Sequence, residues 1–145
     1  MEETAGIDEL RDLVARLKGC TVEAVQVPPD GGGRFGLQLS VQERLRWLWI
    51  HSAAWRVDGP GAVLAASGDG GERLAVDLTM LIGRVVTSVD MRLPGWDTRI
   101  RFDDEVLTIF PVYHHDTSAA PDWTFRMPSG RLLAVGPGPR WAVGE

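Results

Sequence analysis

The hydrophobic residues closest to the N-terminus recur at helical spacing, with charged residues between them. They are Ile7, Leu10, Leu13, Val14 and Leu17. A stripe of this kind predicts an amphipathic helix over residues 7–18. Gly19 follows it directly, and glycine is the residue most often found just after a helix end.

The rest of the chain consists of short β-branched or alternating runs bounded by glycine, proline and aspartate. Such runs predict strands. The predicted strands cover 21–27, 35–41, 45–49, 55–57, 62–66, 85–91, 98–102, 107–111, 123–127 and 132–135. A helical turn is expected near 78–82, and Ser67 to Gly71 is the most linker-like stretch. The predicted fold is a single mainly β (α+β) domain over residues 1–145, with antiparallel strands.

The second half of the sequence repeats the apolar pattern of the first. Gly19, Val22, Val25 and Val27 match residues 64 positions later, and Trp55 matches Trp123 at a spacing of 68. In both copies the pattern changes parity after the first valine, which predicts a shared bulge or a helix-to-strand corner. We therefore expect two similar halves, about 7–66 and 75–145 with 67–74 as linker, that pack with quasi-twofold symmetry.

Several segments of the second half resemble a family of small, uncharacterised actinobacterial domains with a duplicated "gr-V-tsv … L-F-dd-G … W … G" pattern. The segments are 81–89, 100–104, 109–111, Trp123 and 136–138. The first half matches this pattern weakly, and Glu105 stands where a hairpin glycine usually follows the two aspartates. The resemblance implies a fold and no activity.

Composition narrows the classes of function. The net charge of −5 disfavours nucleic-acid binding, which requires a concentrated positive field. Cys20 is the single cysteine, which excludes an internal disulfide and fits a reducing compartment. Residues 1–10 are acidic and lack the features of a signal peptide, and the charge-free stretch 47–55 is too short to span a membrane. These features predict a cytoplasmic protein without membrane contact.

Groups with catalytic or metal-binding chemistry all have a simpler explanation. His114, His115 and Asp116, with His51 as a further ligand, would form the one metal-like cluster, but neighbouring strand residues point to opposite faces. We therefore predict no metal and no cofactor. The carboxylates at 103–105 are expected to form a hairpin turn. Cys20 has no histidine nearby in sequence, and the glycine-rich stretches 31–33 and 68–71 lack the context of a phosphate loop.

Arginine and tryptophan side chains are the remaining candidates. Arg44 with Arg46 and Arg99 with Arg101 each line one face of a strand, where they either contact an acidic partner or face solvent. Three tryptophans, Trp47, Trp55 and Trp123, match apolar positions of the other half and are expected in the core. Trp49, Trp96 and Trp141 have no such match. Trp96 lies in a predicted loop, where it either anchors the loop on the core or contacts a partner.

These observations predict a non-catalytic binding protein, immunity-like or accessory, that engages a protein or peptide. The expected binding residues are Trp96, Tyr113, Trp49, Arg99 and His114. A homodimer is compatible with the sequence. Two other hypotheses are a small-molecule binder with a tryptophan-lined pocket between the halves and a small enzyme that uses His114, His115 or Asp116. A flat, exposed aromatic patch would favour the protein partner, and a deep apolar pocket would favour the small molecule.

Overall fold

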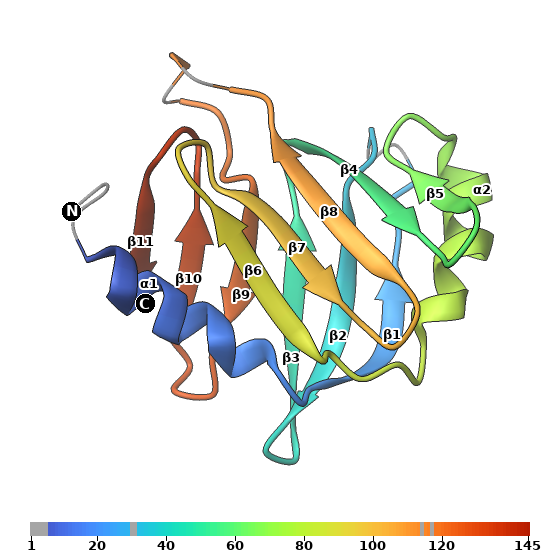
Figure 1. Cartoon of the computed structure of the whole chain (residues 1–145), viewed down its shortest axis with the longest axis horizontal. Helices are drawn as coiled ribbons and strands as arrows, with labels where there is room; N and C mark the ends of the chain where they lie inside the picture. Colours follow the sequence, from blue (N-terminus) through green and yellow to red (C-terminus); the bar gives the residue numbers. More distant parts are fainter. Residues whose placement is uncertain (1–5, 30–31, 114, 117) are drawn as a thin grey trace.

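The computed structural model describes residues 6–29, 32–113, 115–116 and 118–145. Within them the protein is mainly β, with strands in two antiparallel sheets that face each other (Figure 1). The six-stranded sheet has the order β1 (Thr21–Gln26), β2 (Phe35–Val41), β3 (Arg44–Ile50), β9 (Trp123–Arg126), β10 (Leu132–Val135), β11 (Trp141–Gly144). The five-stranded sheet has the order β5 (Val63–Ala66), β4 (Ala53–Asp58), β8 (Val106–Pro111), β7 (Asp97–Arg101), β6 (Ser88–Arg92). The predicted fold class is confirmed.

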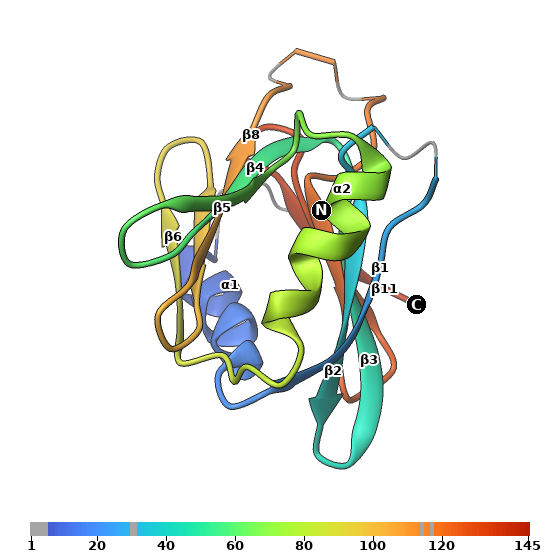
Figure 2. The same ribbon diagram turned by 90° about the vertical axis from the view of Figure 1, so that its right-hand side faces the viewer.

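Two short helices cover the edges of the five-stranded sheet. The helix α1 (Ile7–Val14) continues as a 3-10 turn over Ala15–Leu17 and packs against β6, which confirms the predicted N-terminal helix. The helix α2 (Gly71–Asp77) continues over Leu78–Leu81 and packs against β5. Figure 2 shows α2 at the open side between the two sheets, with α1 farther back. The helices thereby protect edge strands that would otherwise expose unpaired backbone groups.

Two elements differ from the sequence-based expectation. The helix α2 begins at Gly71, inside the predicted linker 67–74. The sequence did not predict this helix, because it follows a glycine-rich turn and only Leu74, together with Leu78 of the next turn, marks its buried side. The last strand, β11, begins at Trp141, beyond 132–135, which is the last strand that the sequence predicts. Trp141 is buried opposite Val135 of β10, so packing in the core defines a strand too short to show a clear alternation.

Large aromatic side chains fill the space between the sheets. Trp55 and Trp123, expected in the core, are 2% and 0% exposed. The ring of Trp55 meets Phe35 of the opposite sheet edge-on, with centroids 4.5 Å apart. Both indole N–H groups have partners, because Trp55 donates to the carbonyl of Gly33 and Trp123 donates to Thr98 Oγ1 at 3.2 Å. The buried aromatic residues thus contribute apolar area without leaving these two donors unpaired.

The chain runs through the two sheets in a repeated order. Helix, 3-10 turn, three antiparallel strands and a two-stranded hairpin in the opposite sheet occur twice, and β11 follows the second time. The two series meet where Thr21 forms an isolated bridge with Val85. There the Gly19 N–H donates to the Val86 carbonyl, and the Gly83 N–H donates to the Val22 carbonyl, each at 2.8 Å. Thr21 and Val85 are 64 positions apart, which is the spacing of the predicted duplication. The duplication itself stays a prediction.

The predicted change of parity is visible in the first series. The register between β1 and β2 shifts between Val22 and Ala24, as a bulge requires. In the second series, Val85 and Val86 pair with the first series, and β6 begins only at Ser88. The segments that follow the two helices thus pair with each other in a similar way, but the strands β1 and β6 begin at different points after them.

Candidate functional site

The strand β3 directs its two tryptophans away from the core. Leu48 and Ile50 face inward with 1% and 0% exposure, so Trp47 and Trp49 lie on the outer face of the six-stranded sheet. The prediction that Trp47 belongs to the core, which rested on its match to Ile109, is therefore wrong. From Trp47 to Ile50 both alternating sets of β3 are apolar, and the two arginines that begin the strand, Arg44 and Arg46, belong to the inner set. The sequence pattern therefore does not tell the inner set from the outer one.

The two tryptophans and their neighbours form one surface. The indoles of Trp47 and Trp49 stack with centroids 5.5 Å apart and planes at 24°. A shallow groove of about 280 Å³ runs beside them. We call this surface the aromatic face, and its residues are Leu45, Arg46, Trp47, Trp49, Thr124, Arg126 and Leu132. Leu45 is 55% exposed, which is unusual for leucine within a strand.

The outer face of the six-stranded sheet carries little charge. The cross-strand partners in β2, β3, β9, β10 and β11 on this face are Gly36, Gln38, Ser40, Leu45, Trp47, Trp49, Thr124, Arg126, Leu132, Ala134, Ala142 and Gly144. Among them Arg126 alone is charged. Its Nη1 donates to the main-chain oxygens of Gly130 at 2.9 Å and Glu145 at 3.2 Å, which holds the guanidinium in place.

The outer face of the five-stranded sheet has the opposite character. Its paired positions include the charged residues Arg56, Asp58, Asp90, Arg92, Asp97, Arg99 and Arg101. Arg56 is paired with Asp58 at 2.8 Å, and Asp90 lies opposite Arg99 in the register. Such alternating charges are typical of a solvated surface. Arg99 therefore lies on a different face from Trp49, and the structure does not bring these two candidates together.

Trp96 anchors a loop from beneath. Its side chain is 1% exposed, and its backbone has a positive φ of 66°. The Trp96 N–H donates to the Arg92 carbonyl at 2.8 Å, and its carbonyl accepts from Thr98 Oγ1 at 3.0 Å. Of the two roles considered for this residue, the structure gives the core anchor. Contact of the Trp96 indole with a partner, as expected for a binding residue, is contradicted by its burial.

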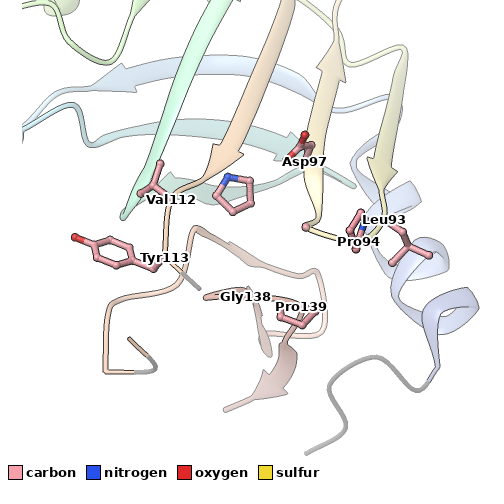
Figure 3. A pocket seen from close by; sticks show the side chains of 9 residues that line it. Leu93, Pro94, Asp97, Val112, Tyr113, Gly138 and Pro139 are labelled. Atoms are coloured by element: carbon pink, nitrogen blue, oxygen red, sulfur yellow. The ribbon is translucent and has the colours of Figure 1, made fainter. Parts of the chain in front are cut away.

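Tyr113 lies beside a cavity at the loop end of the molecule (Figure 3). The cavity has a volume of about 490 Å³, and we call it the loop-end cleft. Its residues are Leu93, Pro94, Gly95, Asp97, Pro111, Val112, Tyr113, Gly138 and Pro139. The expectation of a tryptophan-lined pocket between the halves is not met here, because no tryptophan lines the cleft and all its residues belong to the second half. The candidate His114 lies outside the described residues.

The groups considered for catalysis are far from forming a reactive cluster. Burial and the charge of Arg34 lower the pKa of His51, whose Nε2 lies 2.9 Å from Thr124 Oγ1. Cys20 is buried, and burial raises the pKa of its thiol, which disfavours the reactive thiolate. No group of three or more His, Cys, Asp or Glu residues in the described part of the chain could hold a metal ion. The expectation for His114 and His115 stays a prediction.

The paired carboxylates of the sequence lie where a turn was predicted. Asp103 and Asp104 are exposed between β7 and β8, and the Phe102 N–H donates to the Glu105 carbonyl at 2.9 Å across the turn. Glu105 itself is only 6% exposed, and its Oε2 lies 3.3 Å from Arg84 Nη2. This ion pair, in which Glu105 is buried and Arg84 is exposed, was not indicated by the sequence, and it links the turn to the segment that follows the second helix.

Comparison of the chain with known protein families, with curated proteins and with solved structures finds no match. None of the helices in the described residues is long and apolar enough to cross a membrane. Inferences about function therefore depend on the two surfaces described above, the aromatic face and the loop-end cleft.

Proposed function

We propose that the chain is a non-catalytic interaction protein that binds a protein partner through the aromatic face. The observation that carries this proposal is the contrast between the two outer sheet faces: one has seven charged side chains in register, and the paired positions of the other in β2, β3, β9, β10 and β11 have Arg126 alone, with Arg46 beside the groove. Protein interfaces are depleted in charge at their centre and enriched in tryptophan and arginine. The aromatic face has this composition, and an antiparallel sheet facing water usually does not.

The composition of the aromatic face also indicates the chemistry of the partner. Trp47, Trp49 and Leu45 require an apolar patch opposite them, since burial of such side chains supplies most of the binding energy. The Nε and Nη2 atoms of Arg126 make no hydrogen bond within the described residues and are donors for a carboxylate of the partner. We therefore expect an apolar partner segment that contains one Asp or Glu.

A second copy of the chain fits this surface less well. No paired strand position on this face of β2, β3, β9, β10 and β11 holds a carboxylate, so face-to-face self-association would place Arg126 against apolar or neutral groups. Burial of a cation without a counter-charge is costly. The net charge of −5 and the presence of only two arginines, Arg46 and Arg126, among the residues that line the face likewise disfavour nucleic acid as the partner. With its buried cysteine, the protein is proposed to act in the cytoplasm.

Selection from a displayed library of random 12-residue peptides tests the proposal. Peptides that bind the purified protein are expected to combine aromatic or aliphatic residues with an Asp or Glu. For a selected synthetic peptide, Trp49→Ala is expected to weaken affinity at least tenfold, because a central interface tryptophan contributes about 2 kcal/mol or more. Arg126→Gln is expected to weaken only the peptides that contain the carboxylate.

The matched control is Arg99→Ala, which removes an arginine from the outer face of the other sheet and is expected to leave affinity unchanged. Peptides that bind wild type and Trp49→Ala equally well would refute the proposal. A stable dimer in light scattering that Leu45→Asp dissociates would also refute it, because the occupant of the face would then be a second copy.

A further inference from the structure

The loop-end cleft is formed by three segments that converge from different strands. Leu93, Pro94 and Gly95 come from the β6–β7 loop, Pro111 to Tyr113 from the end of β8, and Gly138 with Pro139 from the β10–β11 loop. Figure 3 shows Pro94 and Pro139 on one side, Val112 on the other, and Asp97 at the strand end above them. Leu93, Val112 and Tyr113 expose 53%, 58% and 42% of their surface, so three large apolar side chains gather at one cavity.

Each of the three segments has one point that is held by the core, by a sheet or by a backbone hydrogen bond. The buried indole of Trp96 anchors the first segment, and Pro111 lies in the β8 ladder opposite Ala53. The β10–β11 loop is closed by a hydrogen bond from the Gly136 N–H to the Arg140 carbonyl at 2.7 Å. A cavity with preformed walls binds a ligand with little loss of conformational entropy. Its volume of about 490 Å³ lies within the range of small-molecule sites, roughly 300–1,000 Å³.

The polar side chains of the cleft are those of Asp97 and Tyr113. Three of its nine residues are prolines, which have a carbonyl and no N–H donor. Asp97 is the single charged residue of the lining, and its carboxylate makes no hydrogen bond or ion pair within the described part of the chain. Arg92 is its cross-strand neighbour, but the Nε of Arg92 lies 3.6 Å from Asp90. The cleft therefore has acceptor capacity and a negative charge that no group of the fold uses.

We propose that the loop-end cleft is a second binding site, which takes an organic cation: an ammonium or guanidinium group on an apolar body. Asp97 is the counter-ion of the cation and accepts its hydrogen bonds, since charge-assisted hydrogen bonds are the stronger kind. The apolar body packs on Leu93, Val112 and the proline rings. The same chemistry occurs in free amines and in arginine side chains of polypeptides.

Ligand titrations followed by amide nuclear magnetic resonance test this proposal with probes of matched shape. Benzylammonium and benzylguanidinium carry the cation, and benzyl alcohol lacks it. We expect the two cations to shift the amide signals of Gly95, Asp97, Val112 and Gly138, and to bind about tenfold more tightly than the alcohol. Acetyl-phenylalanyl-arginine amide forms the peptide arm, and tighter binding of this probe than of benzylguanidinium would identify a polypeptide as the source of the cation.

Two variants with the same change of charge separate the cleft from general electrostatics. Asp97→Asn is expected to remove the preference for the cations and to leave the affinity for benzyl alcohol unchanged. Asp90→Asn, on the neighbouring strand of the same sheet face, is expected to preserve that preference. If the wild-type protein binds the cations and the alcohol with equal affinity, the proposal is wrong. This comparison needs no variant, so it decides the question even if Asp97→Asn folds poorly. Trp49→Ala should leave these titrations unchanged, which separates this site from the aromatic face.

Discussion

Gly36 of β2 lies directly beneath the indole of Trp49 on the adjacent strand. A Cβ at position 36 would come within 2.8 Å of Trp49 Cδ2, closer than real Cβ atoms approach other atoms. The two residues are cross-strand partners, so the absence of a side chain at Gly36 lets the indole lie down across β2. In this position Trp49 stacks with Trp47, and the pair forms a broad apolar surface rather than two separate side chains.

Gly36→Ala is therefore expected to lift the Trp49 indole from the sheet. The stacking of Trp47 and Trp49 should weaken, which is measurable as a loss of the coupled tryptophan signal in near-ultraviolet circular dichroism. Because the overpacked residue is at the surface and not in the core, we expect the free energy of unfolding to fall by about 1 kcal/mol. Affinity for peptides selected on the aromatic face should fall with the stacking signal.

The control for this variant is Gly68→Ala, since Gly68 has open space around its Cα and an ordinary φ. That substitution should change neither the dichroism nor the affinity. A Gly36→Ala protein with an unchanged tryptophan signal would show that the indole has an equally good position elsewhere.

Strand positions were predictable from this sequence, but the choice of inner face was not. Arg44 and Arg46 alternate with apolar residues at the start of β3 and indicate a strand, but from Trp47 to Ile50 both of its faces are apolar. The pairing of Leu48 with Leu37 and Phe125 decides which set is buried, and the contact with Phe125 is distant in sequence. The aromatic face arises from this ambiguity, because a strand with two apolar faces must expose one.

For loop residues, the sequence does not tell a buried side chain from an exposed one. Tyr113 was a candidate because it follows a strand end, and the structure places it at the loop-end cleft. Trp96 was a candidate on the same grounds and is buried, because a positive φ turns its side chain back under the loop. Asp97, which gives the cleft its charge, was not singled out: a lone carboxylate next to a loop tryptophan resembles any turn residue in sequence.

Trp96→Ala should lower the stability of the fold without removing a side chain that contacts a ligand. Truncation of a buried tryptophan leaves a cavity, so we expect the free energy of unfolding to fall by about 3–5 kcal/mol in urea titrations. Trp49→Ala, which truncates a half-buried side chain on the outer face, should cost about 1 kcal/mol. If the two substitutions cost the same, the assignment of Trp96 to the core and of Trp49 to the surface would be wrong.

Asp122 makes the stability of the fold dependent on pH. Its side chain is 1% exposed, neither carboxylate oxygen has a hydrogen-bond partner among the described residues, and burial raises its pKa to about 7. The unfolded chain has an ordinary aspartate pKa of about 3.9, so between about pH 4 and pH 7 the folded state binds the proton more tightly. Stability therefore falls as the pH rises through this range, by up to about 4 kcal/mol.

Asp122→Asn should remove this dependence, because asparagine stays neutral. Urea unfolding at pH 5 and pH 8 would show a smaller difference for the variant than for wild type, and the variant should be the more stable protein at pH 8. Asp103→Asn, in the exposed β7–β8 turn, serves as the control and should keep the wild-type slope. A wild-type stability that rises between pH 5 and pH 8 would contradict the assignment.

Gly19 and Gly83 offer a test of the predicted duplication. Each has a φ of 90°, and at each position a Cβ would meet no atom within 4 Å. The cost of alanine therefore arises from the backbone alone, and we expect Gly19→Ala and Gly83→Ala to lower the free energy of unfolding by about 1–2 kcal/mol each. Gly61→Ala, which has the same open space and no positive φ, should stay within about 0.5 kcal/mol of wild type.

Because Gly19 and Gly83 donate matching hydrogen bonds across the junction, the duplication requires the two costs to agree. A difference of more than about 1 kcal/mol, well beyond the scatter expected for equivalent sites, would mean that the two junctions are similar in shape and not in energy.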